Sequence, residues 1–203
     1  MKILADTDTA SLLEASYELR EIEYKAPFSW ANVGDNWLKE CVIRAILGMT
    51  NTFSGGRIVI GVTENLKTRK FELTGLTEEQ LKSFENYDSI KSTVDGFSTI
   101  QTDFDIDKCI HEGKSYIVVT VREFTDIPTL CRKDGTTDKL KKDDMYVRSK
   151  KAQYSTTRVS ELEIREIVNM AVDKQTKDLQ KRGWSRNIPN VKDFYSKETE
   201  GVL

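Results

Sequence analysis

Basic side chains gather late in the chain, and side chains of this kind bind phosphate groups. Between residues 132 and 154 there are eight basic residues against four acidic ones, with Tyr146 and Tyr154 among them. The net charge of the whole chain is -2, so any binding of nucleic acid must use a local patch. Such a cluster can contact a phosphate backbone, or it can be a solvated charged loop. We call these residues the basic strip: Arg132, Lys133, Lys139, Lys141, Lys142, Arg148, Lys150 and Lys151.

Several other kinds of chemistry are excluded by the residue inventory. His111 is the only histidine and has no evident Ser or Cys partner, which argues against a hydrolytic triad or a nuclease based on two histidines. The three cysteines are widely spaced, so a structural zinc site is not expected, and the reducing cytoplasm is the expected compartment. The chain has no signal-peptide core and no apolar run near the ~18 residues of a membrane span, so no membrane partner is expected.

The loop Asn51, Thr52, Gly55 and Gly56 allows two interpretations. Its glycines permit a sharp reversal between a helix and a strand. Alternatively, its backbone N–H groups could meet a phosphate. It is not a P-loop, because no Gly-Lys-Ser/Thr follows the glycines.

The elements that must position these residues are organised around one helix and one strand. Apolar residues recur at helical spacing from Leu38 to Met49 and predict a widely covered helix. The run Arg57 to Val62 is continuously apolar after its first residue, which is typical of a central strand buried on both faces. An acidic pair of residues, Glu21 and Glu23, alternates with Ile22 and Tyr24 and predicts an early strand.

The rest of the pattern predicts an α+β fold with a mixed, mostly antiparallel sheet and packed helices. Residues 104–107 and 115–121 are expected to form a hairpin around Gly113, and residues 145–148 a final strand. Capping boxes begin helices after Thr77 and Ser160. The apolar pattern fades from Lys174, so we expect one domain over residues 1–173 and a polar linker or tail over residues 174–203.

Six short motifs occur in the order found in one known family. Glu18-x4-Glu23-Tyr24-Lys25 resembles the opening Glu-x4-Glu-Phe-Lys of the Schlafen-type AlbA-like domain. The loop with Gly55-Gly56, followed by Gly61-Val62, resembles its Asn-Thr-x-Gly-Gly…Ile-Gly-Val signature. The remaining matches are 73–76, Gly113-Lys114, Pro128, and 146–149, so the resemblance covers roughly residues 12–172.

The resemblance implies a domain associated with nucleic acid. Bacterial members are usually described as DNA-binding and are often joined to helicase-like or regulatory regions, whereas animal Schlafen proteins cleave tRNA and rRNA with three carboxylates. The matching positions are Glu18, Glu23 and Glu64, which are the predicted catalytic residues and ligands of Mg²⁺ or Mn²⁺. Lys25 joins the basic strip as a predicted nucleic-acid contact. The family usually has Asp-Asp where this chain has Thr63-Glu64, so the third carboxylate reaches further.

Three functions remain open at this point. The first is a metal-dependent endoribonuclease acting on structured RNA. The second is a non-catalytic module that binds DNA or RNA, for example in transcriptional regulation. The third is a protein-interaction domain in which the region of Trp30 and Trp37 docks a partner or a second copy. Separately, the polar tail after Lys174 predicts that the chain is one domain of a longer protein. The family resemblance requires the strand ending at Val62 to lie beside the early acidic strand, and the enzyme function also requires Glu23 and Glu64 to lie on one flank.

Overall fold

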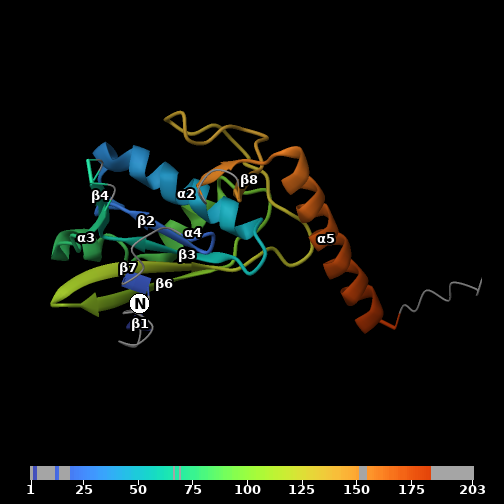
Figure 1. The fold of residues 1–203 in the computed structure, drawn as a ribbon, viewed down its shortest axis with the longest axis horizontal. Coiled ribbons are helices and arrows are strands. Elements are labelled where there is room, and N and C mark those ends of the chain that lie inside the picture. Colours follow the sequence, from blue (N-terminus) through green and yellow to red (C-terminus); the bar gives the residue numbers. More distant parts are fainter. Residues whose placement is uncertain are drawn as a thin grey trace, which may run out of the picture.

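The computed structural model describes residues 2–3, 12–13, 19–65, 67–68, 70–150 and 155–183, and it has the predicted α+β fold (Figure 1). A five-stranded mixed sheet has the strand order β1-β6-β7-β3-β2, and two separate pairs of antiparallel strands are β4-β5 and β8-β9. The strands are β1 (Lys2–Ile3), β2 (Ile22–Lys25), β3 (Gly56–Ile60), β4 (Val62–Asn65), β5 (Lys70–Leu73), β6 (Phe104–His111), β7 (Lys114–Val121), β8 (Tyr146–Arg148) and β9 (Thr156–Arg158). The helices are η1 (Val33–Asp35), α2 (Asn36–Thr50), α3 (Glu78–Lys82), α4 (Tyr87–Asp95) and α5 (Glu161–Lys181).

Strand β3 lies at the centre of the fold, as the apolar run predicts. It pairs in parallel with β2, where Glu23 stands opposite Ile58, and antiparallel with β7. The side chains of Ile58, Val59 and Ile60 are fully buried, so both faces of the strand are covered. The early acidic strand and the central strand are therefore sheet neighbours, which confirms the spatial relation that the sequence argument requires.

The end of this strand differs from the prediction. The apolar run predicts a strand through Val62, but β3 ends at Ile60 and Val62 begins β4 in a separate hairpin. Gly61 has φ +114°, a conformation that side-chain-bearing residues rarely adopt, and a Cβ there would lie 2.9 Å from side-chain atoms of Leu76 and Tyr116. The chain thus leaves the sheet at Gly61, and Glu64 belongs to the hairpin rather than to the central strand.

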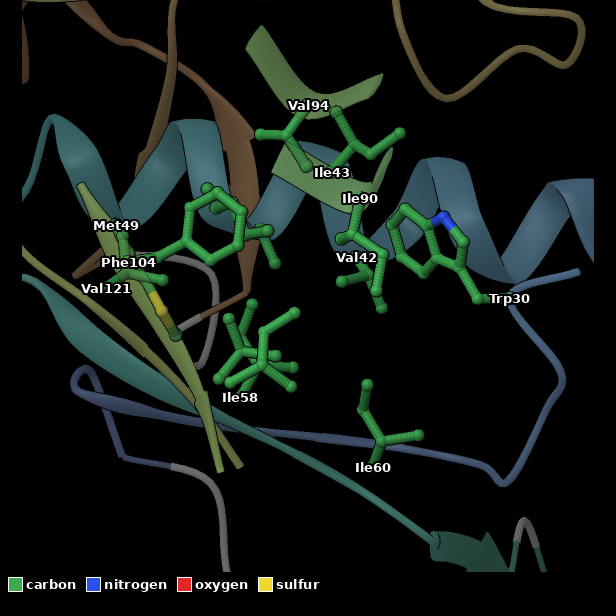
Figure 2. Close-up of a cluster of buried hydrophobic side chains, with 14 of the residues drawn as sticks. Trp30, Val42, Ile43, Met49, Ile58, Ile60, Ile90, Val94, Phe104 and Val121 are labelled. Carbon is green, nitrogen blue, oxygen red and sulfur yellow. The ribbon is translucent and has the colours of Figure 1, made fainter. Parts of the chain in front are cut away.

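Helix α2 packs across one face of the sheet and supplies much of the core (Figures 1 and 2). Val42 and Met49 of this helix meet Ile58 and Ile60 of β3 in one buried cluster. The opposite face is covered by a second cluster. Its buried members are Leu12, Leu13, Tyr24, Val59, Val62, Cys109, Tyr116 and Val118. Because β3 contributes to both clusters, its position and that of its neighbour β2 are held from two sides.

Helix α5 extends away from the sheet at one end of the molecule (Figure 1). Its predicted capping box is present, with Ser160 and Glu163 bonding to each other's backbone N–H. The helix continues past Lys174 to Lys181, so the predicted boundary between domain and tail falls inside it. A solvent-exposed helix needs little apolar surface, and i,i+4 ion pairs such as Arg182–Asp178 support its last turns. Residues 184–203 lie outside the described residues. Within the described chain, no helix is long and apolar enough to cross a membrane.

Candidate nucleic-acid interface

A cleft of about 590 Å³ opens between β2, α2 and the β4-β5 hairpin. Its charged lining residues come from four parts of the chain: Glu23 and Lys25 of β2, Arg44 of α2, Glu64 of β4, and Lys139 of the loop before β8. The parallel pairing of β2 with β3 brings β2 close to the point where the chain enters β4. The cleft therefore unites two of the three predicted catalytic carboxylates with two of the predicted nucleic-acid contacts. Glu18 lies outside the described residues.

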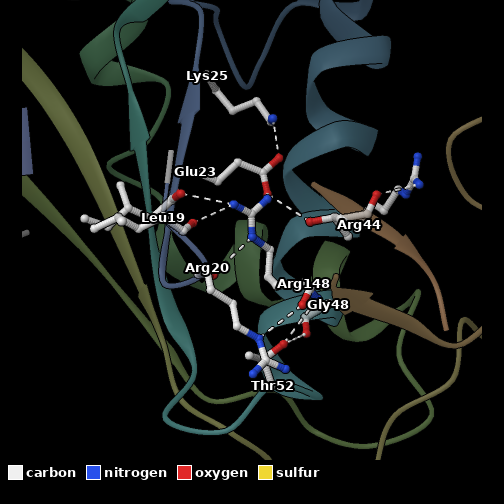
Figure 3. A network of polar contacts seen from close by, with 10 residues as sticks. Leu19, Arg20, Glu23, Lys25, Arg44, Gly48, Thr52 and Arg148 are labelled. Atoms are coloured by element: carbon white, nitrogen blue, oxygen red, sulfur yellow. Dashed lines mark hydrogen bonds and ion pairs between the residues drawn. The ribbon is translucent and has the colours of Figure 1, made fainter. Parts of the chain in front are cut away.

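The carboxylate of Glu23 is buried and bound on both of its oxygens (Figure 3). Its Oε1 accepts a short hydrogen bond from Lys25 Nζ. Its Oε2 accepts one from Arg148 Nη1 at 2.6 Å and another from Thr156 Oγ1 at 2.9 Å. Burial raises the pKa of Glu23, but the charges of Lys25 and Arg148 and these hydrogen bonds outweigh it, and the net pKa shift is downward. Glu23 is thus an ionised carboxylate held between two cations.

Arg148 occupies the centre of this network (Figure 3). Its side chain is 0% exposed, although the sequence pattern predicts a surface position in the basic strip. Besides Glu23, its guanidinium donates to three backbone carbonyls, those of Leu19 at 2.9 Å, Ile22 at 3.1 Å and Arg20 at 3.2 Å. The expected surface position is therefore wrong for Arg148, because its charge is buried to pair with β2.

Glu40 holds the loop 132–144 against helix α2. Its buried carboxylate accepts hydrogen bonds from the backbone N–H and hydroxyl groups of both Thr136 and Thr137, including one of 2.8 Å from Thr136 Oγ1. These bonds lower the pKa of Glu40 despite the opposing effect of burial. Two residues further on, the loop places Lys139 in the cleft. The position of this lysine is thus set by a buried acid on the helix.

The other described members of the basic strip do not line the cleft with Lys139. Lys133 Nζ lies 4.4 Å from the centre of the Phe97 ring, and Lys150 pairs with Glu166 of α5 at 3.0 Å. Arg132, Lys141 and Lys142 are exposed on the loop. Lys151 lies outside the described residues. The basic strip is therefore not one surface: Lys139 lines the cleft, Arg148 is buried and Lys150 lies beside α5. The remaining described residues, Arg132, Lys133, Lys141 and Lys142, belong to the loop before β8.

The order of these segments matches a known family model. The model described as "Schlafen, AlbA_2" matches residues 18–157, which is more than half of the chain. The chain belongs to the Schlafen AlbA_2 family. The match contains Glu18, Glu23 and Glu64 as well as the Arg148 strand, so it covers every part of the described cleft.

Two solved structures show partial similarity to this Schlafen AlbA_2 chain. The DIP2311 protein of Corynebacterium diphtheriae is 14% identical with a TM-score of 0.49, and the similarity covers 79% of this chain and 27% of that one. The N-terminal domain of a Nitrosomonas europaea protein described as related to a putative ATP-dependent DNA helicase RecG is 20% identical with a TM-score of 0.39, covering 59% and 74%. This chain thus spans about a quarter of the Corynebacterium protein. No curated protein matches it.

The described part of this Schlafen AlbA_2 domain does not fit a divalent metal. Among these residues no three Asp, Glu, His or Cys side chains lie together as a metal-binding group. Both oxygens of Glu23 are already bound by cations, which would compete with Mg²⁺ or Mn²⁺ for the same lone pairs. Glu64 lines the same cleft, but from the exposed hairpin. The metal therefore remains a prediction that depends on Glu18.

The loop 51–56 is built as a tight connection in this Schlafen AlbA_2 domain. The buried Asn51 side chain donates to the carbonyls of Thr129 and Tyr146, both at 2.9 Å, and accepts from Thr129 N at 2.8 Å. Thr52 Oγ1 donates to Gly48 O at 2.7 Å. Gly55 has φ +67°, and a Cβ there would lie 2.0 Å from a backbone oxygen of β7. These contacts account for the Asn, Thr and Gly residues through the fold itself, which favours the turn interpretation over phosphate binding.

Two residues of the candidate site, Arg44 and Glu40, were not predicted from the sequence. Arg44 lies among the buried residues of α2, lines the cleft and donates from Nη2 to Thr156 O at 2.7 Å. Glu40, four residues earlier, anchors the loop that carries Lys139. Their signal in the sequence is that both are charged residues within the apolar stretch of α2, at a spacing of about one turn, which places them on the same side. Charged residues are costly to bury without partners, so such positions point to specific contacts.

Proposed function

We propose that this Schlafen AlbA_2 domain binds nucleic acid through its phosphate backbone and does not hydrolyse it. The observation that supports the proposal is the charge of the cleft. Lys25, Arg44 and Lys139 line it against Glu23 and Glu64, and Arg148 adds a fourth cation directly behind Glu23. Three positive and two negative side chains thus line the cleft, and Lys139 also pairs with Asp138 at 3.4 Å. With Arg148 behind Glu23, positive charge still exceeds negative charge here, in a chain whose overall charge is -2.

The ion pairs of Glu23 determine how strongly this carboxylate would repel a phosphate in the cleft. An unpaired carboxylate at the base of the cleft would repel phosphate, but Glu23 is shared by two cations and so leaves a net positive charge in its own cluster. Arg44 forms no ion pair with a described carboxylate and contacts a carbonyl and the Tyr146 ring instead. A phosphate entering the cleft would therefore meet an excess of positive charge.

Two exposed lysines, Lys141 and Lys142, add positive charge on the same loop that carries Lys139. The backbone N–H of Lys141 donates to Tyr146 Oη at 2.8 Å, and that of Lys142 donates to Asp134 Oδ1 at 3.0 Å. Both side chains are exposed while their backbone is held in place. A preformed loop loses less conformational entropy on binding than a mobile one, which favours contact with a phosphate backbone.

The test is a titration of fluorescently labelled RNA and DNA at several salt concentrations, read by anisotropy. The wild type is expected to bind with an affinity that falls steeply as salt rises. Changing Lys141→Glu and Lys142→Glu together should weaken binding and reduce the salt slope by about 0.7–0.9 for each phosphate that the variant no longer neutralises. Lys177→Glu and Lys181→Glu together, on the exposed part of α5, are the control for the same change in net charge. The comparison of RNA with DNA also separates an RNA-binding role from a DNA-binding, regulatory one.

Either of two results would overturn the proposal of phosphate binding. One is the absence of binding by the wild type to every RNA and DNA probe at low salt. The other is equal weakening by the pair of α5 changes and by the pair of loop changes, since that would show a dependence on total charge and not on the loop.

A metal-dependent endoribonuclease is the second candidate, favoured by the presence of Glu23 and Glu64 in one cleft. Incubation of a structured RNA with the protein and Mg²⁺ or Mn²⁺ tests it, with Glu64→Gln as the variant because this exposed residue can change without removing the buried Glu23 network. Cleavage by the wild type that disappears in Glu64→Gln would replace the proposal of binding alone. Intact RNA after binding would leave phosphate binding as the function.

A further inference from the structure

One large aromatic ring stands exposed at the cleft. Trp37, in the first turn of α2, lines the cleft and keeps 51% of its surface exposed. Trp30, which was expected to share a docking region with it, is buried and packs against Phe28 and Phe84. The core therefore uses Trp30, whereas the fold leaves Trp37 in solvent beside charged residues.

The surroundings of Trp37 combine an aromatic surface with a cation. Lys139 Nζ lies 5.2 Å from the centre of its ring, within the range of a cation–π contact. With Lys139 in place, half of the residue is still accessible, so another flat group can reach it without displacing the lysine. Phe71 of β5 adds a second aromatic residue to the lining, packed at 4.8 Å on the ring of Tyr24.

An exposed ring beside cations matches the way in which proteins hold single strands. Bases stack on aromatic side chains while lysine and arginine follow the phosphates, and this works for any base because each has a π-face. In a duplex the faces of the bases are covered by their neighbours, so a protein ring can stack only on an unpaired base.

We propose that Trp37 is a stacking platform for an unpaired base, with Lys139 contacting an adjoining phosphate, so that the domain prefers single-stranded nucleic acid to duplex. This inference rests on the proposed function and specifies its substrate. A protein partner is the competing occupant. The five charged side chains that line the cleft favour nucleic acid, because the centres of protein–protein interfaces are depleted in charged residues.

The experiment uses three labelled probes of equal length, about 12 nucleotides, which is within the range that single-strand sites cover. They are a single-stranded oligouridine, the same backbone without bases, and a duplex. Trp37→Ala is expected to weaken binding of the oligouridine roughly 5- to 150-fold, as loss of one stacked base implies. It should leave the base-free probe and the duplex unchanged. Trp37→Phe keeps a π-face and should retain most of the affinity. Val33→Ala removes another exposed apolar side chain, in η1, and should have no effect.

Three results would overturn the inference. Unchanged binding of the oligouridine by Trp37→Ala would show that Trp37 does not stack on a base. Equal weakening of all three probes would show that the change acts through Lys139 or the fold, and a melting curve of each variant distinguishes these two. A dimer in sedimentation that Trp37→Ala abolishes, with single-strand binding unaffected, would assign the ring to a second copy. In each case binding of the duplex by the wild type would leave the proposed function standing, whereas absence of binding to all probes would reject both.

Discussion

The buried pair of Arg148 and Glu23 yields the most demanding prediction. Arg148→Met removes a fully buried guanidinium but keeps much of its apolar volume. It leaves Glu23 with Lys25 as its only ionic partner in the described network, and it leaves the carbonyls of Leu19 and Ile22 without this donor. Removal of one partner of a buried pair typically costs about 3–5 kcal/mol, because the other charge stays buried without compensation.

The surrounding residues determine where in that range the loss should fall. Lys25 still neutralises Glu23, which favours the lower end. The carbonyl of Leu19 still accepts from Ile22 N at 3.1 Å, but those of Arg20 and Ile22 lose this donor and favour the upper end, at about 1–3 kcal/mol for each buried acceptor left without a partner. We therefore expect the free energy of unfolding to fall by about 3–5 kcal/mol in urea denaturation followed by circular dichroism, with an unchanged m-value.

A surface arginine provides the matched control. Arg122 pairs with Asp103 at 2.8 Å and with Asp105 at 2.5 Å, so it makes two ion pairs, but half of its side chain is exposed. Arg122→Met should cost at most about 1 kcal/mol, as is usual for exposed pairs. A loss for Arg148→Met as small as that of the control would refute the reasoning. So would a double variant with Glu23→Gln whose loss is the sum of the two single losses, since residues in one network should be coupled.

Two further predictions concern ionisation and the loop. Because folding lowers the pKa of Glu23, its contribution to stability is complete above the ordinary glutamate pKa of about 4.3 and is lost as pH falls through the lower, folded pKa. Glu23→Gln should therefore flatten the acid limb of a plot of unfolding free energy against pH, and an unchanged slope would contradict the pairing. Glu40→Ala should lower the free energy of unfolding by about 1.5–3 kcal/mol and speed hydrogen exchange at Thr136 and Thr137, whereas unchanged exchange would show that Glu40 does not hold the loop.

The sequence correctly predicts those elements that are determined by residues close together in the chain. The hairpin of β6 and β7 and the capping boxes of Thr77 and Ser160 are confirmed, because each depends on residues close together in the chain. The continuous apolar run correctly predicts burial of β3 on both faces. The same run cannot show where the strand ends. That end depends on Gly61 and on its close approach to Leu76 and Tyr116, which are distant in sequence.

The candidate site was less predictable because its charges are paired over long distances. Glu23 and Arg148 are 125 residues apart. The family resemblance assigns the acid to a metal, and the charge pattern assigns the base to phosphate. In the folded chain they bind each other. A count of charges along the sequence cannot detect this, because it adds residues without knowing which of them neutralise one another.

This pairing also changes how the remaining charges should be interpreted. Once Glu23 is satisfied by Lys25 and Arg148, it contributes less repulsion to the cleft than its formal charge suggests, and its role becomes to hold β2 to β8. The groups left to meet a ligand are then those whose side chains face solvent near the cleft, above all Lys139 with Trp37. An arrangement of this kind, with a neutralised acid inside and a cation and an aromatic ring outside, is suited to hold a nucleic-acid strand, whereas metal-dependent cleavage would require Glu23 to exchange its cationic partners for the metal.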